Sequence, residues 1–458
     1  MTTLIEVVNP STHELVATVP NSGSKEAIEA VDRAHAAFTS WSQRTAQERS
    51  TLLMNWHHLI LENLTALSTL MTKEQGKPLK EAAGELQYAA SFIAWYAEEG
   101  KRIYGQTIPA SHPNKRILVQ KQPVGVMAAI TPWNFPAAMI TRKVAPALAA
   151  GCTAIVKPAE QTPLTALRLA ELAVEAGIPS DVLQVVTGDA PAIASAWMND
   201  RRVRKISFTG STAVGKLLMK QAADTVKKVS LELGGHAPFI VLADANIEAA
   251  VQGLVASKYR NAGQTCVCTN RVYVHEDIAE AFTTAFVDAV AKLTVGDGLQ
   301  DATDIGPLID DAAVAKVQAH IDDAKAHGGT VVYGGEVAPH SLFMTPTVIT
   351  NAHDHMLCMR EETFGPLAPI ATFTSTEEVI QRANDTPFGL AAYVYTENLR
   401  QAISVSEALE YGIVGINDGL PSVAQAPFGG MKESGLGREG GHFGIEEYLE
   451  IKYISIGL

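Results

Sequence analysis

One cysteine stands in a sequence context that suits a covalent nucleophile. Cys266 closes the segment Asn261-Ala-Gly-Gln-Thr-Cys266, which separates a helix predicted over 247–258 from a strand predicted over 271–274. A thiol held in a tight turn between two regular elements can be both exposed and oriented, as attack on an electrophile requires. A small buried cysteine is the competing interpretation, and for an isolated cysteine it is the commoner one. Cys266 is therefore a candidate nucleophile, and the prediction needs support from other residues that could assist it.

Two further side chains have the chemistry to assist such a nucleophile. Glu232 ends an apolar strand predicted over 229–233, where burial would raise the pKa of its carboxyl into the range of a general base. Asn134 follows the apolar run 124–130, where its amide N–H groups could stabilise a developing oxyanion. Each residue alone is more typical of a strand end or a loop, so the prediction depends on their joint occurrence.

A strand, a glycine turn and a helix start follow one another in Phe208-Thr-Gly210-Ser211-Thr-Ala-Val-Gly215. Free backbone N–H groups and the helix dipole make such a start favourable for a phosphate. The spacing is neither the P-loop pattern nor the G-x-G-x-x-G fingerprint, so a simple tight turn explains it equally well. Lys157 and Glu160 follow another apolar strand, at the edge where open α/β sheets bind ligands, and their side chains could hydrogen-bond ribose hydroxyls.

The elements that must position these residues alternate between helix and strand. Apolar residues recur at helical spacing through 26–100, and the pattern over 103–122 is more extended and mixed. From 124 onward short apolar strands alternate with helices, and the alternation starts again after Gly234-Gly235. That order predicts parallel sheets covered by helices, so the fold class is α/β with two Rossmann-like domains.

The composition narrows the class of protein. The 458 residues include 49 acidic and 36 basic ones, which gives a formal net charge of −13, and 47% are hydrophobic. A high apolar fraction with mixed charge excludes a disordered chain, and an acidic balance without a basic block argues against nucleic-acid binding. The longest uncharged stretch, 122–141, contains prolines that argue against a membrane span. The first residues lack a signal-peptide pattern and four cysteines cannot form a disulfide scaffold, so we expect a cytoplasmic protein.

These segments, in this order, resemble the NAD(P)-dependent aldehyde dehydrogenase superfamily over essentially the whole chain. Three more motifs of that pattern are Glu361-Glu362-Thr-Phe364-Gly-Pro366, Thr386-Pro-Phe-Gly-Leu390 and Pro427-Phe428-Gly-Gly-Met-Lys-Glu-Ser434-Gly. The resemblance implies an NAD(P)-binding domain from 1–102 and 123–233 and a catalytic domain from 234–433. It also implies an oligomerisation hairpin at 103–122 with a tail at 434–458, and assembly into a homodimer or homotetramer.

The resemblance also implies a reaction. The Cys266 thiolate would attack an aldehyde carbonyl, and the Asn134 side chain with the Cys266 backbone N–H would hold the resulting oxyanion. Hydride transfer to the nicotinamide would leave a thioester, which water activated by Glu232 would hydrolyse to the free acid. The residues expected to bind the cofactor are Trp133, Lys157, Glu160, Gly210, Ser211, Gly215, Glu362 and Phe364.

Three residues indicate which aldehyde is oxidised. Arg142, Arg260 and Ser422 match those by which the succinate-semialdehyde dehydrogenases of the superfamily hold the distal carboxylate, and Phe135 and Phe428 are expected to line the same pocket. A guanidinium offers paired donors to a carboxylate, so the predicted substrate is succinate semialdehyde. Ion pairs of the two arginines within the catalytic domain are the alternative interpretation. Glutarate semialdehyde, one methylene longer, is the alternative substrate.

The cofactor preference and a second thiol each have two interpretations. Glu160 would repel a 2′-phosphate, which favours NAD, whereas Lys157 would attract one, so NADP is the alternative. Cys268 forms a C-x-C pair with Cys266 and is either half of a redox switch, as the resemblance implies, or a packed thiol. In an extended segment the two cysteines would share one face, at the edge of disulfide range.

Three alternative kinds of protein or site can be compared with the sequence. The run His353-Asp-His355 lacks further ligands nearby, so no metal is expected. A cysteine hydrolase that works without nicotinamide would use Cys266 and Glu232 but would leave the ribose- and phosphate-facing segments without purpose. A catalytically idle binding protein would need neither side chain. We therefore expect an enzyme whose partners are a cofactor and a small aldehyde that carries a carboxylate.

Overall fold

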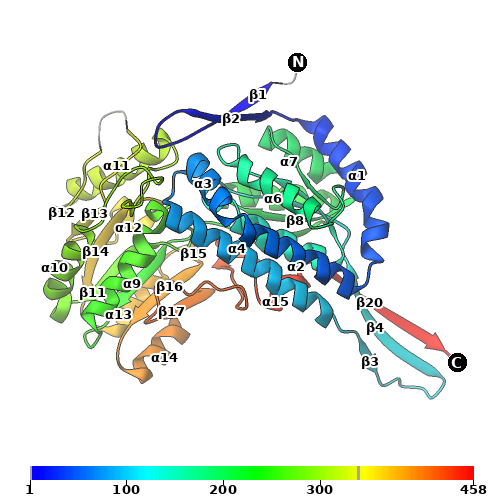
Figure 1. Ribbon diagram of the computed structural model, residues 1–458. Coiled ribbons are helices and arrows are strands. Elements are labelled where there is room, and N and C mark those ends of the chain that lie inside the picture. Colours follow the sequence, from blue (N-terminus) through cyan, green and yellow to red (C-terminus); the bar gives the residue numbers. More distant parts are fainter. Residues whose placement is uncertain (1–2, 338–340) are drawn as a thin grey trace.

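The computed structural model describes residues 3–337 and 341–458. Two open sheets with helices packed against them make up most of the molecule, and a narrow three-stranded sheet projects from one end (Figure 1). The C-terminus lies at the tip of this projection. The predicted α/β class is confirmed.

The first large sheet has six strands in the order β19-β9-β8-β5-β6-β7. Neighbouring strands are parallel, except that β19 runs antiparallel to β9. The central strands β5 and β6 are apolar and buried along nearly their whole length, because helices cover both faces of the sheet. The strands are β5 (Val126–Ile130), β6 (Thr153–Lys157), β7 (Leu183–Val185), β8 (Val203–Thr209), β9 (Lys228–Glu232) and β19 (Gly435–Leu436).

The helices that cover this sheet form two apolar cores with it. Helices α2 to α6 pack on one face, and α1, α7 and α8 pack on the other. The helical spacing predicted through 26–100 is confirmed as four successive helices, α1 (Ser24–Ser42), α2 (Ala46–Glu62), α3 (Leu64–Gln75) and α4 (Leu79–Glu99). The others are α5 (Ala138–Ala150), α6 (Pro163–Glu175), α7 (Ala190–Asn199) and α8 (Thr212–Ala222).

The second large sheet has seven strands in the order β12-β13-β14-β11-β10-β16-β17, all parallel to their neighbours except β12 at one edge. One apolar core joins it to helices α9 to α14. The second α/β alternation predicted after Gly235 is thus confirmed. The strands are β10 (Ala237–Val241), β11 (Thr269–His275), β12 (Thr330–Tyr333), β13 (Thr347–Thr350), β14 (Leu367–Phe373), β16 (Ala391–Tyr395) and β17 (Ile413–Ile416). The helices are α9 (Ile247–Tyr259), α10 (Ala279–Val290), α11 (Asp311–Ala326), α12 (Leu357–Arg360), α13 (Thr376–Asn384) and α14 (Leu399–Ala408).

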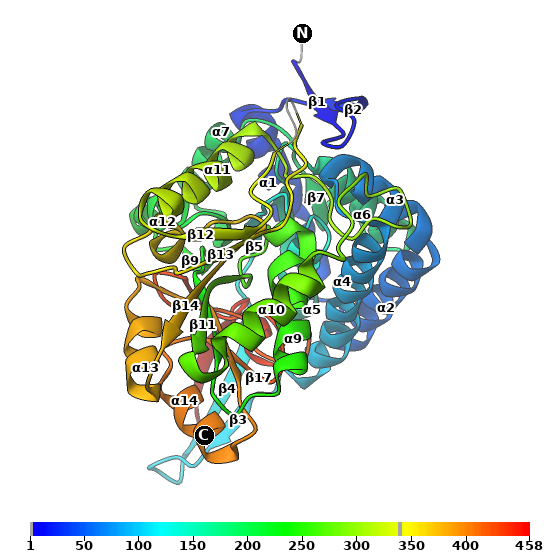
Figure 2. The same cartoon turned by 90° about the vertical axis from the view of Figure 1, so that its left-hand side faces the viewer.

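The projecting sheet consists of β3 (Gln106–Ile108), β4 (Lys115–Pro123) and β20 (Leu449–Gly457), with β4 in the middle. It extends away from both large sheets (Figure 2). Apolar side chains such as Ile451 and Tyr453 on β20 are exposed. The tail predicted at 434–458 is not one element. Because β19 pairs with β9, its residues belong to the first large sheet, and only β20 joins the projection.

Smaller elements complete the chain. Strands β1 (Leu4–Val8) and β2 (Leu15–Pro20) form an antiparallel pair, as do β15 (Phe388–Gly389) and β18 (Met431–Lys432), and α15 (Phe443–Glu446) precedes β20. Within residues 3–337 and 341–458, no helix is long and apolar enough to cross a membrane.

Candidate active site

The carboxyl ends of the parallel strands bring predicted site residues to one edge of the first sheet. Strand register places Ile130 beside Lys157, and Thr209 beside Glu232. The segments that follow β5, β8 and β9 therefore start from the same edge. This is the edge at which open α/β sheets bind ligands.

Cys266 lies in a turn between α9 and β11, as its sequence context predicts. The chain enters this turn through Asn261 and Ala262, whose φ angles of 52° and 55° are in the left-handed region. That conformation costs energy for residues with a Cβ and persists where surrounding contacts fix it. Asn261 supplies such contacts, because its backbone N–H donates to Glu81 at 2.9 Å and its side chain donates to the backbone carbonyl of Asn134 at 2.9 Å.

Two cavities meet at Cys266. One cavity, of about 330 Å³, contains Arg260 and Ser422, and we call it the substrate cavity after its expected ligand. The other, of about 360 Å³, contains Ser211 and Glu362, and we call it the cofactor cavity for the same reason. Cys266 lines both. The thiol can therefore reach a ligand in either one. Predicted residues in the substrate cavity are Phe135, Arg142, Arg260, Ser422 and Phe428, and those in the cofactor cavity are Trp133, Asn134, Gly210, Ser211, Glu362 and Phe364.

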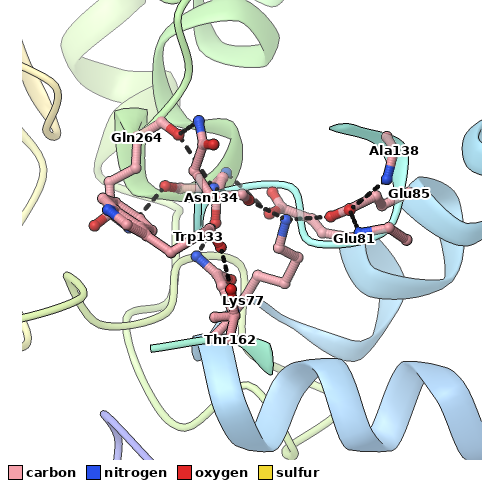
Figure 3. A network of polar contacts seen from close by, with 11 residues as sticks. Lys77, Glu81, Glu85, Trp133, Asn134, Ala138, Thr162 and Gln264 are labelled. Carbon is pink, nitrogen blue, oxygen red and sulfur yellow. Dashed lines mark hydrogen bonds and ion pairs between the residues drawn. The ribbon is translucent and has the colours of Figure 1, made fainter. Parts of the chain in front are cut away.

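A buried network holds Asn134 in place (Figure 3). Lys77 donates to the backbone carbonyl of Asn134 at 2.8 Å and pairs with Glu85 at 2.5 Å. Glu85 also accepts the backbone N–H of Ala138 at 3.2 Å, at the start of α5. The Asn134 side chain donates to the carbonyl of Gln264 at 3.0 Å, in the turn that carries the nucleophile. An amide nitrogen has two N–H groups, so the second one is available to an oxyanion.

Burial sets the charge states of Cys266 and Glu232. It raises the pKa of the Cys266 thiol to about 12, with Arg142 opposing the rise and Glu362 and Glu232 adding to it. It also raises the pKa of Glu232 well above its usual range, and the charge of Glu439 adds to that rise. Both shifts favour the uncharged forms of the two groups in this structure.

The two arginines predicted to bind a carboxylate differ in their partners. Arg142 on α5 pairs with buried Glu439 at 2.7 Å, and Glu439 also pairs with Lys143. This is the internal ion pair that the alternative interpretation foresees. Arg260 makes no ion pair within the described part of the chain, and its guanidinium lies 5.4 Å from the ring centroid of Phe135. The Nε atom of Arg260 is buried without a hydrogen-bond partner among the described residues. Arg260 is thus the cation available to an external carboxylate.

The cofactor cavity has the features of a dinucleotide site. Gly210 precedes α8 and Ser211 caps it, which presents a helix N-terminus to the cavity, as favours a phosphate. The rings of Trp133 and Phe364 meet edge to face with their centroids 5.7 Å apart. Glu362 accepts a backbone N–H from the loop after β9 at 2.9 Å, and burial raises its pKa to about 7. An anion site, aromatic rings and a carboxylate fit the phosphates, the ring and a ribose of such a cofactor.

Three residues predicted to bind the cofactor do not line this cavity. Lys157 and Glu160 form an ion pair with each other at the end of β6, on the same sheet edge. A Cβ on Gly215 would lie 2.4 Å from the side chain of Leu233, so glycine there permits α8 to approach the end of β9. The structure thus gives Gly215 a role in helix packing, and its contact with the cofactor stays a prediction.

Cys268 is buried and borders neither cavity. Its Sγ lies 3.3 Å from Nζ of Lys258, and burial raises the pKa of its thiol. The backbone turns at Cys266 and Val267, so the two cysteines do not lie in an extended segment. Both thiols are free, and the redox switch stays a prediction. In the described ranges, no group of three or more His, Cys, Asp or Glu side chains is arranged to hold a metal ion.

Three residues near the site were not predicted. Glu439 pairs with Arg142, Lys77 supports the backbone of Asn134, and Tyr88 lines the substrate cavity. Lys77 and Tyr88 belong to the region around α4, whose pattern predicts only helical core. Glu439 stands in a glycine-rich loop, and a lone carboxylate in such a loop is the signal that would have indicated it.

The fold and the site together place a cysteine thiol between two cavities, an arrangement that suits a cofactor-dependent enzyme that reacts through this thiol. A model of the aldehyde dehydrogenase family matches residues 1–454, and the chain belongs to this family. The superfamily resemblance stated from the sequence is confirmed.

Individual relatives have more specific names. A succinate-semialdehyde dehydrogenase of Escherichia coli, named for NADP(+), is 56% identical over 455 residues, which cover 99% of this chain and 94% of that protein. A glutarate-semialdehyde dehydrogenase of Pseudomonas putida is 56% identical over 454 residues, which cover 99% of this chain and 94% of that protein. The crystal structure of succinate-semialdehyde dehydrogenase from Burkholderia pseudomallei matches with a TM-score of 0.98 at 55% identity, and covers 100% of this chain and 95% of the other.

Proposed function

We propose that this chain oxidises succinate semialdehyde to succinate with NAD(P) as the hydride acceptor. The observation that carries the proposal is the position of Arg260, a guanidinium without an ion pair in the described ranges, in the same cavity as the Cys266 thiol. A short aldehyde that ends in a carboxylate suits this arrangement, because the cation can hold one end while the other reaches the sulfur. Ser422 lines the same cavity and offers a hydroxyl donor.

The chain's own residues perform the chemistry at the carbonyl. The sulfur of Cys266 attacks the aldehyde carbon, and its proton passes through solvent water to the carboxylate of Glu232, which releases it to solvent before the hydrolysis step. The oxyanion then accepts hydrogen bonds from the free N–H of Asn134 and the backbone N–H of Cys266, and removal of one such donor typically lowers the rate about 10²–10³-fold. When bound, the oxidised nicotinamide supplies the acceptor for the hydride. Glu232, whose raised pKa suits a base near neutral pH, removes a proton from the water that hydrolyses the thioester.

The residues around the cofactor cavity would hold the dinucleotide. Gly210 and Ser211 at the start of α8 would bind its phosphates, and Glu362 a ribose. The ion pair of Lys157 with Glu160 would face the adenosine ribose, where the Glu160 carboxylate disfavours a 2′-phosphate. We therefore propose a preference for NAD, although the E. coli relative is named for NADP(+).

The proposed reaction is tested by following the absorbance of reduced nicotinamide after the protein is mixed with NAD and succinate semialdehyde. The native chain should give steady turnover and C266A none. E232Q should release about one reduced cofactor per site and then slow down, because hydrolysis of the thioester needs the base. Formation of acid without reduced nicotinamide would indicate a cysteine hydrolase instead.

Glutarate semialdehyde is the second candidate substrate. The P. putida relative is named for it, and one methylene changes discrimination by only about 1–3 kcal/mol. Comparison of kcat/KM for the two semialdehydes under identical conditions decides between them. We expect the higher value for succinate semialdehyde.

The projecting sheet supports a proposal on assembly. Ile451 and Tyr453 on β20 are 73% and 61% exposed, which is unfavourable for large apolar side chains on a free surface. We propose that a second copy of the chain covers this sheet in a homodimer or a homotetramer. Light scattering on the native chain and on a variant truncated before β20 measures the assembly.

We also propose a cytoplasmic location. The four free cysteines suit a reducing compartment.

A further inference from the structure

One face of α4 lines the substrate cavity. Glu81, Gly84, Glu85 and Tyr88 all border it, at helical spacings of three and four residues. The two carboxylates of this stripe have protein partners, since Glu85 pairs with Lys77 and Glu81 accepts the backbone N–H of Asn261. Gly84 offers no side chain. Tyr88 is therefore the residue of this stripe whose polar group is left for a ligand.

The hydroxyl of Tyr88 is buried without an acceptor for its hydrogen. Its oxygen is shielded from solvent, and the hydroxyl donates to no acceptor among the described residues, although the guanidinium of Arg142 lies close enough to donate to it. A buried hydroxyl whose hydrogen has no acceptor destabilises a folded protein. The ring itself is well packed, edge to face against Phe92 with the centroids 4.9 Å apart. Phenylalanine would make the same ring contact, so packing alone does not explain a tyrosine here.

The surroundings of this hydroxyl are those of an anion site. The charges of Arg142 and Arg260 both act on it, and both arginines line the same cavity. The Nε atom of Arg260 is also buried without a partner among the described residues. The Tyr88 hydroxyl and the Arg260 Nε–H thus belong to one cavity, and Arg142 adds a second positive charge to that of Arg260. A carboxylate, with about four lone-pair sites, can accept from all of them.

We infer that Tyr88 determines substrate specificity by donating its hydroxyl hydrogen to the distal carboxylate of the aldehyde, together with Arg260 and Ser422. This inference rests on the proposed function, because it assigns a third donor to the same carboxylate. The role is binding and not chemistry at the carbonyl. Loss of the hydroxyl should therefore raise KM for a carboxylated aldehyde and leave kcat nearly unchanged.

The variant Y88F tests this assignment because it removes only the hydroxyl and keeps the ring. With succinate semialdehyde, kcat/KM should fall about 10- to 100-fold through KM, as expected for a lost hydrogen bond to a charged group. With butanal, which has a methyl group in place of the carboxylate, kcat/KM should stay within about twofold. The ratio of the two values isolates recognition of the carboxylate.

A matched control lies on the same helix. Tyr96 also has a buried hydroxyl without a partner in the described ranges, but it does not line the cavity. Y96F should leave the ratio unchanged. If Y88F also leaves the ratio unchanged while R260M lowers it, the role of Tyr88 is wrong and the carboxylate site stands. If neither Y88F nor R260M changes the ratio, the proposed carboxylate recognition itself is wrong.

Discussion

Replacement of Arg260 by methionine is the most direct test of substrate recognition. R260M removes the guanidinium but keeps an unbranched apolar side chain beside Phe135, whose ring centroid lies 5.4 Å from the guanidinium carbon. Because Arg260 has no ion-pair partner among the described residues, the substitution leaves no orphaned protein carboxylate. The main expected effect is therefore on the ligand that Arg260 binds, with a smaller effect on Cys266, whose pKa the charge of Arg260 lowers.

The magnitude follows from what remains in the cavity. Removal of one partner of a buried hydrogen-bonded charge pair costs about 2–5 kcal/mol. Arg142 stays in the same cavity and still attracts a carboxylate, although Glu439 neutralises part of its charge. We therefore expect the lower half of that range, about 2.7 kcal/mol, which is about a hundredfold loss of kcat/KM for succinate semialdehyde.

The assay compares succinate semialdehyde with butanal at saturating cofactor. R260M should lose about a hundredfold in kcat/KM with the first aldehyde and less than about threefold with the second. Thermal unfolding of R260M near that of the native chain would show that the fold is intact. Equal losses with both aldehydes would refute the reasoning, because they would show that Arg260 supports the architecture of the site and not the carboxylate.

Three further substitutions have defined outcomes. E439Q removes a negative charge that raises the pKa of Glu232, so that pKa should fall. The acid limb of the plot of kcat against pH should then move to lower pH, and a move to higher pH would contradict this. In E160Q, the ratio of kcat/KM for NADP to that for NAD should rise about tenfold because a like charge no longer faces the 2′-phosphate, and an unchanged ratio would remove Glu160 from cofactor choice. In G235A, the new Cβ would lie 2.4 Å from the backbone oxygen of Cys266, so the nucleophile must shift. A displacement of about 1 Å lowers kcat about a hundredfold, whereas native kcat in G235A would show that the turn adjusts freely.

Local pattern was sufficient to predict most of the fold. The strands that precede Asn134 and Lys157 are continuous apolar runs, and such runs have few alternatives to buried parallel strands. The residues at their carboxyl ends then meet at one edge whatever the length of the intervening helices. The tail was harder to divide, because the pairing of β19 with β9 depends on contacts across more than two hundred residues of sequence and not on its own pattern.

The sequence predicts site residues whose own chemical type is needed. It does not predict residues that matter only because the fold brings them beside another side chain. Cys266 was singled out from its sequence context, and Arg260 from the resemblance to the superfamily. Glu439 pairs with Arg142, which lies 297 residues earlier in the sequence. The residues around Glu439 in the sequence do not indicate which side chain it contacts. The role of Gly215 was hard to predict for a related reason, since a glycine near a helix start can serve a ligand, a close packing contact or both. The packing contact is with the side chain of Leu233.

The two interpretations of Arg142 are compatible because of the charges around it. Arg142 and Lys143 share the single carboxylate of Glu439, so this buried cluster carries one positive charge in excess, at the border of the substrate cavity. The excess charge attracts a substrate carboxylate, while Arg142 and Glu439 act in opposite directions on the pKa of Glu232. Recognition and base strength therefore depend on the same cluster. A substitution in it must change both KM and the pH profile. A substitution of Arg260, which lies outside the cluster, changes mainly recognition and acts on the chemistry only through its smaller effect on the pKa of Cys266.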